Sequence, residues 1–401
     1  MRKPLARNVK ALAGVSFFTD VASEMIYPLL PLFLTTVLGA SAAALGVIEG
    51  IAESVSSLLR LPAGWLSDRL GRRKPLILFG YGVAAIARPL IGLSQGAGQV
   101  LAIRVSDRFG KGVRSAPRDA LIADSVEESQ RGYAFGLHRA ADSFGAVVGP
   151  LIAWAVLGLG WVGLRELFLW AAVPGAISVA LVLFVVRERE PAVRVAPVAA
   201  PSATPPASGA TGEASAALGA PFWRYLSVLL LFTLSTSTDA FLLLRASQLG
   251  VPTALIPILW AMLHVVKSST SALGGGLSDR LGRRPLILGG WTIYAAVYLG
   301  FAAATVQWQA WALFLVYGLY FGMTEGTEKA LVADLVPAAR RGTAFGWFNA
   351  ALGLGALPAS VIFGLIWEGY GPETAFATGA ALAGLAALFF TIAVPARAVT
   401  R

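Results

Sequence analysis

The chain has 401 residues, of which 56% are hydrophobic and 13% are charged, and its formal net charge is +10. This apolar excess is too large for an ordinary soluble core and indicates a protein that crosses a membrane many times. The sequence contains no cysteine, which excludes disulfides, thiolate nucleophiles and cysteine-ligated metals. With two histidines as the only imidazoles, a catalytic constellation is hard to assemble. We therefore expect no enzymatic activity, no cofactor and no bound metal.

Stretches of about 20 apolar residues, the length that crosses a bilayer core, recur along the sequence. In chain order, the first six predicted helices are 14–37, 44–66, 75–95, 98–122, 131–158 and 164–186. The next six are 222–246, 252–276, 285–307, 309–335, 341–366 and 371–394. The first helix contains Asp20 and Glu24, so we interpret it as a retained helix and not a signal peptide. The sequence predicts an all-α membrane protein with twelve transmembrane helices.

Basic residues are distributed unevenly among the predicted loops. Lysine and arginine gather at the termini and in alternate loops, whereas the opposite loops LGAS and GYGPET contain none. By the positive-inside rule, we expect both termini and the central linker in the cytoplasm, and a protein of the plasma membrane. The net charge is then mainly a topology signal, and we do not expect a nucleic-acid partner.

The two halves of the sequence repeat each other. GWLSDRLGRRK from Gly64 returns as GGLSDRLGRR from Gly275, and Asp124 recurs as Asp334. Such parallel repeats predict two six-helix bundles with the same orientation. The segment between them is rich in proline, alanine, serine and glycine, which is typical of a flexible linker. We predict an N-terminal bundle, a cytoplasmic linker and a C-terminal bundle over 1–186, 187–220 and 221–401.

The repeated loop resembles the signature loop of major facilitator superfamily transporters, a resemblance that covers essentially the full length. RFGKGVRSA from Arg108 is similar to the helix-4 motif of that family. GAVVGP from Gly145 resembles the start of its helix-5 antiporter motif, although Ala153 and Trp154 stand where a closing glycine pair would be. The resemblance implies the two-bundle fold of that family and a small organic solute. The partial helix-5 motif slightly favours efflux.

The signature loop also has a physical interpretation as a gate. Asp68 and its counterpart Asp279 could each lie at a positive helix end and pair with nearby arginines, in contacts that break when the gate opens. Alternatively, the arginines only fix the topology. We also expect Arg118 to face Glu328 across the two halves. The predicted gating residues are Gly64, Asp68, Arg69, Gly71, Arg72, Arg118, Asp279, Arg280, Glu328 and Lys329.

The fourth predicted helix carries a stripe of charge. Its seven charged residues fall within an arc of about 140° at 100° per residue. An isolated charge at the bilayer centre costs at least ~2.5 kcal/mol, so these groups must face partners or a polar pathway. Ion pairing with carboxylates of the first two helices is one interpretation. A solute pathway is the other, and the repeat favours it, because Arg108 and Lys111 correspond to Gly318 and Phe321 in the second half.

These observations predict a secondary active transporter that works by alternating access, coupled to protons or, alternatively, to sodium. We favour an anionic or zwitterionic solute. The alternatives are an exporter of cationic or amphiphilic drugs and a membrane sensor that does not transport. We expect a monomer in the bilayer whose partners are the solute and protons. Asp20, Glu24 and Asp142 are the predicted proton carriers, and the predicted cavity residues are Tyr27, Arg104, Arg108, Lys111, Arg114, His138, Arg139 and Glu325.

Overall fold

The computed structural model describes residues 7–127, 130–188, 218–337 and 340–394. Every regular element in these residues is helical, which confirms the all-α prediction. The first group of helices comprises α1 (Arg7–Ile26), α2 (Leu30–Leu32), α3 (Ala42–Leu70), α4 (Lys74–Leu90), α5 (Ala97–Asp124), α6 (Arg131–Gly158), α7 (Leu164–Trp170) and α8 (Ala172–Phe184). The second comprises α9 (Ala220–Ser235), α10 (Asp239–Gln248), α11 (Ile256–Leu281), α12 (Arg283–Ala303), α13 (Gln307–Asp334), α14 (Arg341–Tyr370) and α15 (Pro372–Ala393).

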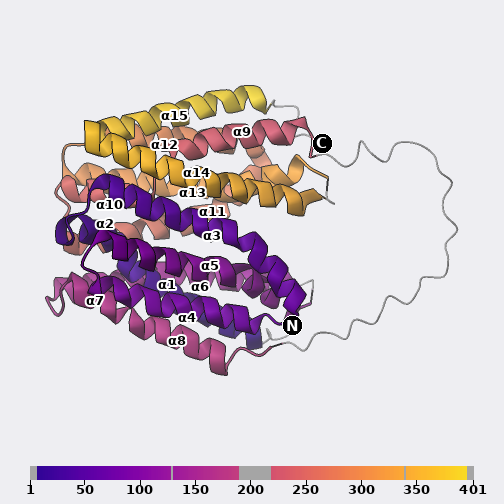
Figure 1. Cartoon of the computed structure of the whole chain (residues 1–401). Coiled ribbons are helices and arrows are strands. Elements are labelled where there is room, and N and C mark those ends of the chain that lie inside the picture. The colour runs from indigo at the N-terminus through magenta and orange to yellow at the C-terminus, as the bar shows by residue number, and fades with distance from the viewer. Residues whose placement is uncertain (1–6, 128–129, 189–217, 338–339, 395–401) are drawn as a thin grey trace, which may run out of the picture.

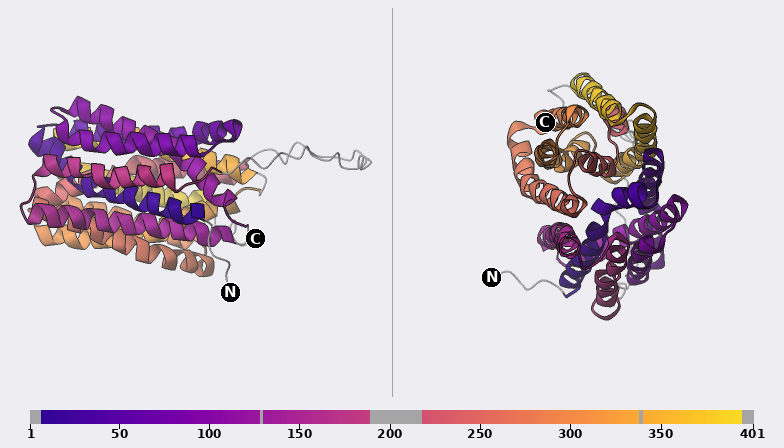
Figure 2. Two further views of the ribbon diagram at one scale, coloured as in Figure 1. Left: turned by 90° about the horizontal axis from the view of Figure 1, so that it is seen from below. Right: turned by 90° about the vertical axis from the view of Figure 1, so that its left-hand side faces the viewer.

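The helices run along one common direction and form two groups side by side (Figures 1 and 2). Ten helical segments of the described chain are long and apolar enough to cross a membrane. The helices α5 and α13, which correspond in the repeat, complete the twelve crossings. Most of the predicted linker, residues 189–217, lies outside the described residues, so its boundaries stay a prediction.

Three of the predicted spans contain a break in the helix, although each remains one apolar segment long enough to cross a membrane. The first bends through short segments of other helix types, η1 (Tyr27–Leu29) and η2 (Phe33–Val37), because Pro28 and Pro31 lack the amide hydrogen that a helix needs. Another divides at Ala171 between α7 and α8, because the ring of Pro174 conflicts with the carbonyl four residues earlier.

The third division separates α9 from α10 at residues 236–238. The Thr236 hydroxyl donates to the Thr233 carbonyl at 2.7 Å, and the Thr238 hydroxyl accepts from the Ala240 amide at 3.4 Å as an N-cap. Threonine side chains thus replace backbone hydrogen bonds and favour a helix boundary here.

The helix ends define two ends of the molecule. At the end we call the linker end, on the right of Figure 1, α3 passes into α4, α8 ends and α9 begins. We call the opposite end the far end. At the linker end, Arg73 Nη2 pairs with Asp124 Oδ2 at 3.0 Å, and Arg283 Nε pairs with Asp334 Oδ2 at 3.3 Å. In each half, an ion pair therefore joins the signature loop to the last residue of the fourth helix of that half, α5 or α13.

The two halves meet along a seam where α3 packs on α14 and α6 packs on α11. A Cβ atom on Gly353 would lie 2.7 Å from the Cβ of Ser57, so only glycine permits this approach of α3 and α14. Next to it, the Ser54 hydroxyl donates to the Gly353 carbonyl at 2.6 Å. At the far end, the Ala43 amide donates to Glu368 at 3.2 Å. These contacts hold the seam together from the far end to its middle.

Candidate functional site

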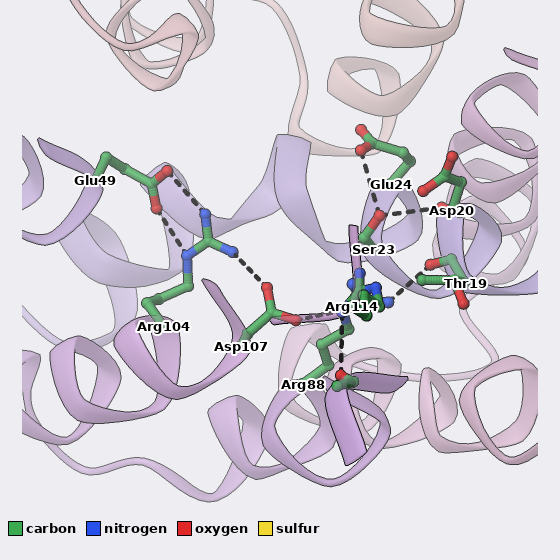
Figure 3. A network of polar contacts seen from close by, with 10 residues as sticks. Thr19, Asp20, Ser23, Glu24, Glu49, Arg88, Arg104, Asp107 and Arg114 are labelled. Atoms are coloured by element: carbon green, nitrogen blue, oxygen red, sulfur yellow. Dashed lines mark hydrogen bonds and ion pairs between the residues drawn. The ribbon is translucent and has the colours of Figure 1, made fainter. Parts of the chain in front are cut away.

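Part of the charged stripe on α5 forms a buried ion-pair network with neighbouring helices (Figure 3). Arg104 donates from Nε and Nη2 to the two carboxylate oxygens of Glu49, each at 2.8 Å. Asp107 accepts from Arg88 Nε at 3.0 Å and lies 3.6 Å from Arg104 Nη1. Arg88 also donates to the Thr19 carbonyl at 2.7 Å. These charges neutralise one another, as the ion-pairing interpretation of the stripe expects.

Three charged members of this network, Asp107, Glu49 and Arg88, were not among the predicted site residues. Asp107 was recognised only as part of the charged stripe, and Glu49 and Arg88 lie outside that stripe. The signal was present, because each is a single charge in an otherwise apolar stretch, "GVIEGIA" and "AAIARPLIG". Their pairing with α5 depends on how α3 and α4 pack, which the sequence alone does not specify.

Two further basic residues of α5 have their contacts within the first half. Arg114 is 4% exposed, lies 4.5 Å from the centre of the Tyr81 ring and donates to the Gly80 carbonyl at 3.1 Å. These contacts place it against α4. Arg118 pairs with its neighbour Asp119 at 2.8 Å.

The predicted proton carriers lie on α1 and α6. Asp142 accepts a hydrogen bond from Ser16 and lies 3.5 Å from His138 Nδ1. The Asp20 carboxylate, by contrast, makes no hydrogen bond and no ion pair with any described residue. The charges that act on it electrostatically are those of Asp142, Glu24, Lys111 and Arg88. Asp20 is thus a carboxylate inside the bundle without a direct counter-charge.

Glu24 connects the two halves. Its Oε2 atom accepts a hydrogen bond from Trp260 Nε1 at 2.8 Å and lies 3.8 Å from His264 Nε2, both on α11. One turn further along the chain, the Tyr27 ring lies 5.2 Å from the Trp260 ring, and its hydroxyl is 3.4 Å from the Thr238 hydroxyl. The first helix therefore contacts the second half through a carboxylate surrounded by aromatic rings.

A second polar contact crosses the seam between α6 and α13. Arg139 pairs with Glu325, whose other oxygen lies 3.3 Å from Lys267 Nζ on α11. The Lys267 ammonium also lies 4.1 Å from the centre of the Phe321 ring. Of the predicted cavity residues, the structure thus brings Tyr27, Arg139 and Glu325 to the seam. His138 lies beside Asp142 within the first half.

The structure describes only some of the predicted gating residues. The side chains of Asp68 and Asp279 lie outside the described residues. Gly71 ends α3 with a left-handed backbone, φ 63°, and Gly64 packs towards Ala116. Arg69, Arg72, Arg280 and Lys329 are exposed, and Arg69 stacks on the Trp65 ring at 5.3 Å.

Arg118 and Glu328 do not pair in this structure. Arg118 pairs with Asp119, and Glu328 accepts from Trp291 Nε1 at 2.9 Å inside the second half. Their contact across the halves stays a prediction for another state, in which the two halves approach each other at the linker end.

Comparison with known proteins decides the family. The family model of the Major Facilitator Superfamily matches residues 12–359 and 265–401. The chain belongs to this superfamily. It is 32% identical over 398 residues to an uncharacterized MFS-type transporter of Methanocaldococcus jannaschii, covering 96% of each chain. It is 24% identical over 373 residues to the multidrug resistance protein MdtG of Enterobacter lignolyticus, covering 90% of this chain and 85% of that protein.

Among solved structures, the nucleoside transporter NupG shares the fold with a TM-score of 0.77 at 14% sequence identity, covering 96% of this chain and 99% of that one. The protein is therefore a membrane transporter of the MFS type with many membrane-spanning helices.

Proposed function

We propose that the protein is a proton-coupled secondary transporter of small organic anions or zwitterions, and that it works by alternating access, with efflux slightly favoured. The observation that carries the proposal is the contrast among the buried charges. Arg88, Arg104, Glu49 and Asp107 neutralise one another, whereas Asp20 on one side and Arg108 and Lys111 on the other have no ion-pair partner within 4.0 Å among the described residues. A carboxylate without a direct ion-pair partner can take up and release a proton, and cations in excess of the carboxylates around them can hold an anion.

The contacts across the seam support alternating access. Glu24 and Glu325 each join the two halves through polar groups that a rocking motion would separate. Because Asp20 is one helical turn from Glu24, protonation of either carboxylate changes the charge beside the seam. Proton binding and the relative position of the halves are then linked.

The test is proton movement in proteoliposomes that contain an internal pH dye. Panels of organic anions, zwitterions and cations are added to wild type, Arg108→Ala and Asp20→Asn. Anion-dependent proton movement that both substitutions abolish supports the proposal. Proton movement with cations alone, lost in Asp20→Asn and kept in Arg108→Ala, would contradict it.

That second outcome would favour an exporter of cationic or amphiphilic drugs. Two observations support this alternative. Several relatives are named as multidrug resistance proteins, and the Glu24 carboxylate lies beside the rings of Tyr27 and Trp260, a combination that suits a cationic ligand.

A further inference from the structure

Three cations near the seam have no carboxylate of the described residues within ion-pairing distance. Arg60 on α3, and Arg108 and Lys111 on α5, make no ion pair within 4.0 Å with the described residues. The Nε atoms of Arg60 and Arg108 are buried and have no hydrogen-bond partner. A buried donor without a partner carries a desolvation cost, which is larger when the donor is charged. These groups are therefore poised to donate hydrogen bonds to a negatively charged ligand.

Close packing of α3 on α5 gathers these cations. A Cβ atom on Gly112 would lie 2.7 Å from the Cβ of Leu59 and 3.1 Å from the Ser56 carbonyl. Lys111 and Arg108, one residue and one turn before Gly112, are thereby held against the helical turn that ends at Arg60.

The electrostatic interactions agree with this geometry. Arg60 and Arg108 both act on Lys111 and on Glu53, and Asp20 also acts on Lys111. Three cations therefore face two carboxylates, an excess of one positive charge (3 − 2). The excess becomes two when Asp20 carries its proton.

A groove opens beside Arg60, between α3 and α14. Its volume is about 190 Å³, and its walls include Ser57, Leu58, Phe345, Asn349 and Ala350 as well as Arg60. An apolar cavity of ~150 Å³ is enough to hold benzene. The groove thus has room for an aryl ring or a short alkyl group, with cationic and amide groups at its edge.

We propose that the three cations and the groove form a two-part binding site for an organic acid. Arg60, Arg108 and Lys111 hold its carboxylate or phosphate group, and the groove holds an apolar group slightly larger than benzene. Arginine suits this role because its planar guanidinium can donate two parallel hydrogen bonds to either acid. Because α3 and α14 belong to different halves, a solute in this site contacts both. The inference deepens the proposed function, since it specifies the class of anion and adds Arg60 and the groove.

The experiment measures binding to the full chain in nanodiscs of zwitterionic lipid by calorimetry. Benzoate and phenyl phosphate carry both parts, acetate and inorganic phosphate carry the acid alone, and benzyl alcohol carries the ring alone. We expect benzoate or phenyl phosphate to bind at least tenfold more tightly than all three single-part probes. The better of the two identifies the acid. Equal affinities for benzoate and acetate, and for phenyl phosphate and phosphate, would show that the groove does not bind the ring and would overturn that part of the proposal.

Variants separate the two parts of the site. Arg60→Gln should weaken the two-part probes and the acid-only probes at least tenfold, whereas Arg224→Gln, at an exposed arginine on α9, should leave all affinities unchanged. Ala350→Leu, which fills the groove, should weaken only the probes with a ring. Helical content and unfolding temperature confirm that each variant is folded. Unchanged affinity in folded Arg60→Gln would overturn the site.

The outcomes also separate this inference from the proposed function. If benzoate and phenyl phosphate do not bind while another organic anion drives proton movement in proteoliposomes, the proposed function holds and this site is wrong. If they bind as predicted while no anion or zwitterion moves protons, the site is supported and the proposed transport is wrong.

Discussion

The two halves of the molecule share one helix arrangement but fill equivalent positions with different chemistry. On α5, the inward positions are Arg104, Asp107 and Lys111, and on α13 the residues 210 positions later are Phe314, Tyr317 and Phe321. The buried partner Arg88 likewise corresponds to Tyr298. In the second half, these positions belong to an aromatic cluster in which Tyr294 stacks on Tyr298 at 4.2 Å and also contacts Tyr317.

The difference shows that the fold does not require charge at these positions. Aromatic packing buries apolar area and gains ring contacts, whereas buried ion pairs carry a desolvation cost that their attraction often fails to exceed. The second half thus retains the more stable solution. The first half retains the costly one, which we attribute to solute and proton binding. The experiments below are ordered from the largest expected effect to the smallest.

The largest effect on stability is expected for Arg104→Met. The substitution leaves Glu49 and Asp107 buried without one of their cations, so we expect a loss of about 3–5 kcal/mol in the free energy of unfolding, measured by titration with SDS. The combination with Glu49→Gln should recover most of it. In the second half, Tyr298→Phe removes one hydrogen bond, to the Ser237 hydroxyl at 2.8 Å, and should cost only about 1 kcal/mol. Equal losses for Arg104→Met and Tyr298→Phe would remove the contrast between the halves.

Asp20→Asn should separate function from stability. Because the Asp20 carboxylate has no ion-pair partner among the described residues, the free energy of unfolding should change by no more than about 1 kcal/mol. Solute-dependent proton movement in proteoliposomes should fall at least tenfold. A variant that moves protons at the wild-type rate would exclude Asp20 as a proton carrier.

A smaller effect is expected at the seam. Arg139 has a side chain that is 65% exposed, so its pair with Glu325 is screened by solvent and should contribute about 0.2–1 kcal/mol. Arg139→Gln should therefore change the equilibrium between states with a short and a long distance between the halves at the linker end by roughly 1.5- to 5-fold. The chain has no cysteine, so spin labels at Gly132→Cys and Gly342→Cys can report this distance by double electron–electron resonance. The same shift in Arg139→Gln combined with Glu325→Gln supports pairing, whereas additive shifts contradict it.

The smallest effects are expected where the halves are alike. The Arg73–Asp124 and Arg283–Asp334 pairs are both partly exposed at the linker end. Arg73→Ala and Arg283→Ala should each lower the free energy of unfolding by about 0.2–1 kcal/mol. We expect the two losses to be similar. A loss several times larger in one half than in the other would show that the two bridges are not equivalent.

The fold could largely be predicted from the sequence, because apolar segment length, alternating basic loops and the internal repeat are properties of the chain itself. The breaks beside Pro28 and Pro174 could also have been predicted, since proline cannot donate in a helix. The break before Asp239 is harder to predict from the sequence, because hydroxyl residues are tolerated within many transmembrane helices.

The candidate site was predicted at the level of a helix face and not of individual pairs. The periodicity of α5 placed Arg104 and Arg108 on the same side, but the structure pairs Arg104 with the Glu49 carboxylate and gives Arg108 no ion pair with the described residues. The distinction depends on distances between helices, which glycines such as Gly112 set through backbone contact. Arg60 was not predicted for the same reason, since its role depends on where α3 meets both α5 and α14.

The most direct test compares one position in the two halves. Lys111→Gln and Phe321→Leu change residues that correspond in the repeat, and both are assayed for proton movement driven by an organic anion in proteoliposomes. The account predicts that Lys111→Gln lowers the rate at least tenfold, while Phe321→Leu stays within twofold of wild type at equal reconstitution. Equal rates in the two variants, or a larger loss in Phe321→Leu, would contradict the claim that the first half carries the solute and proton chemistry.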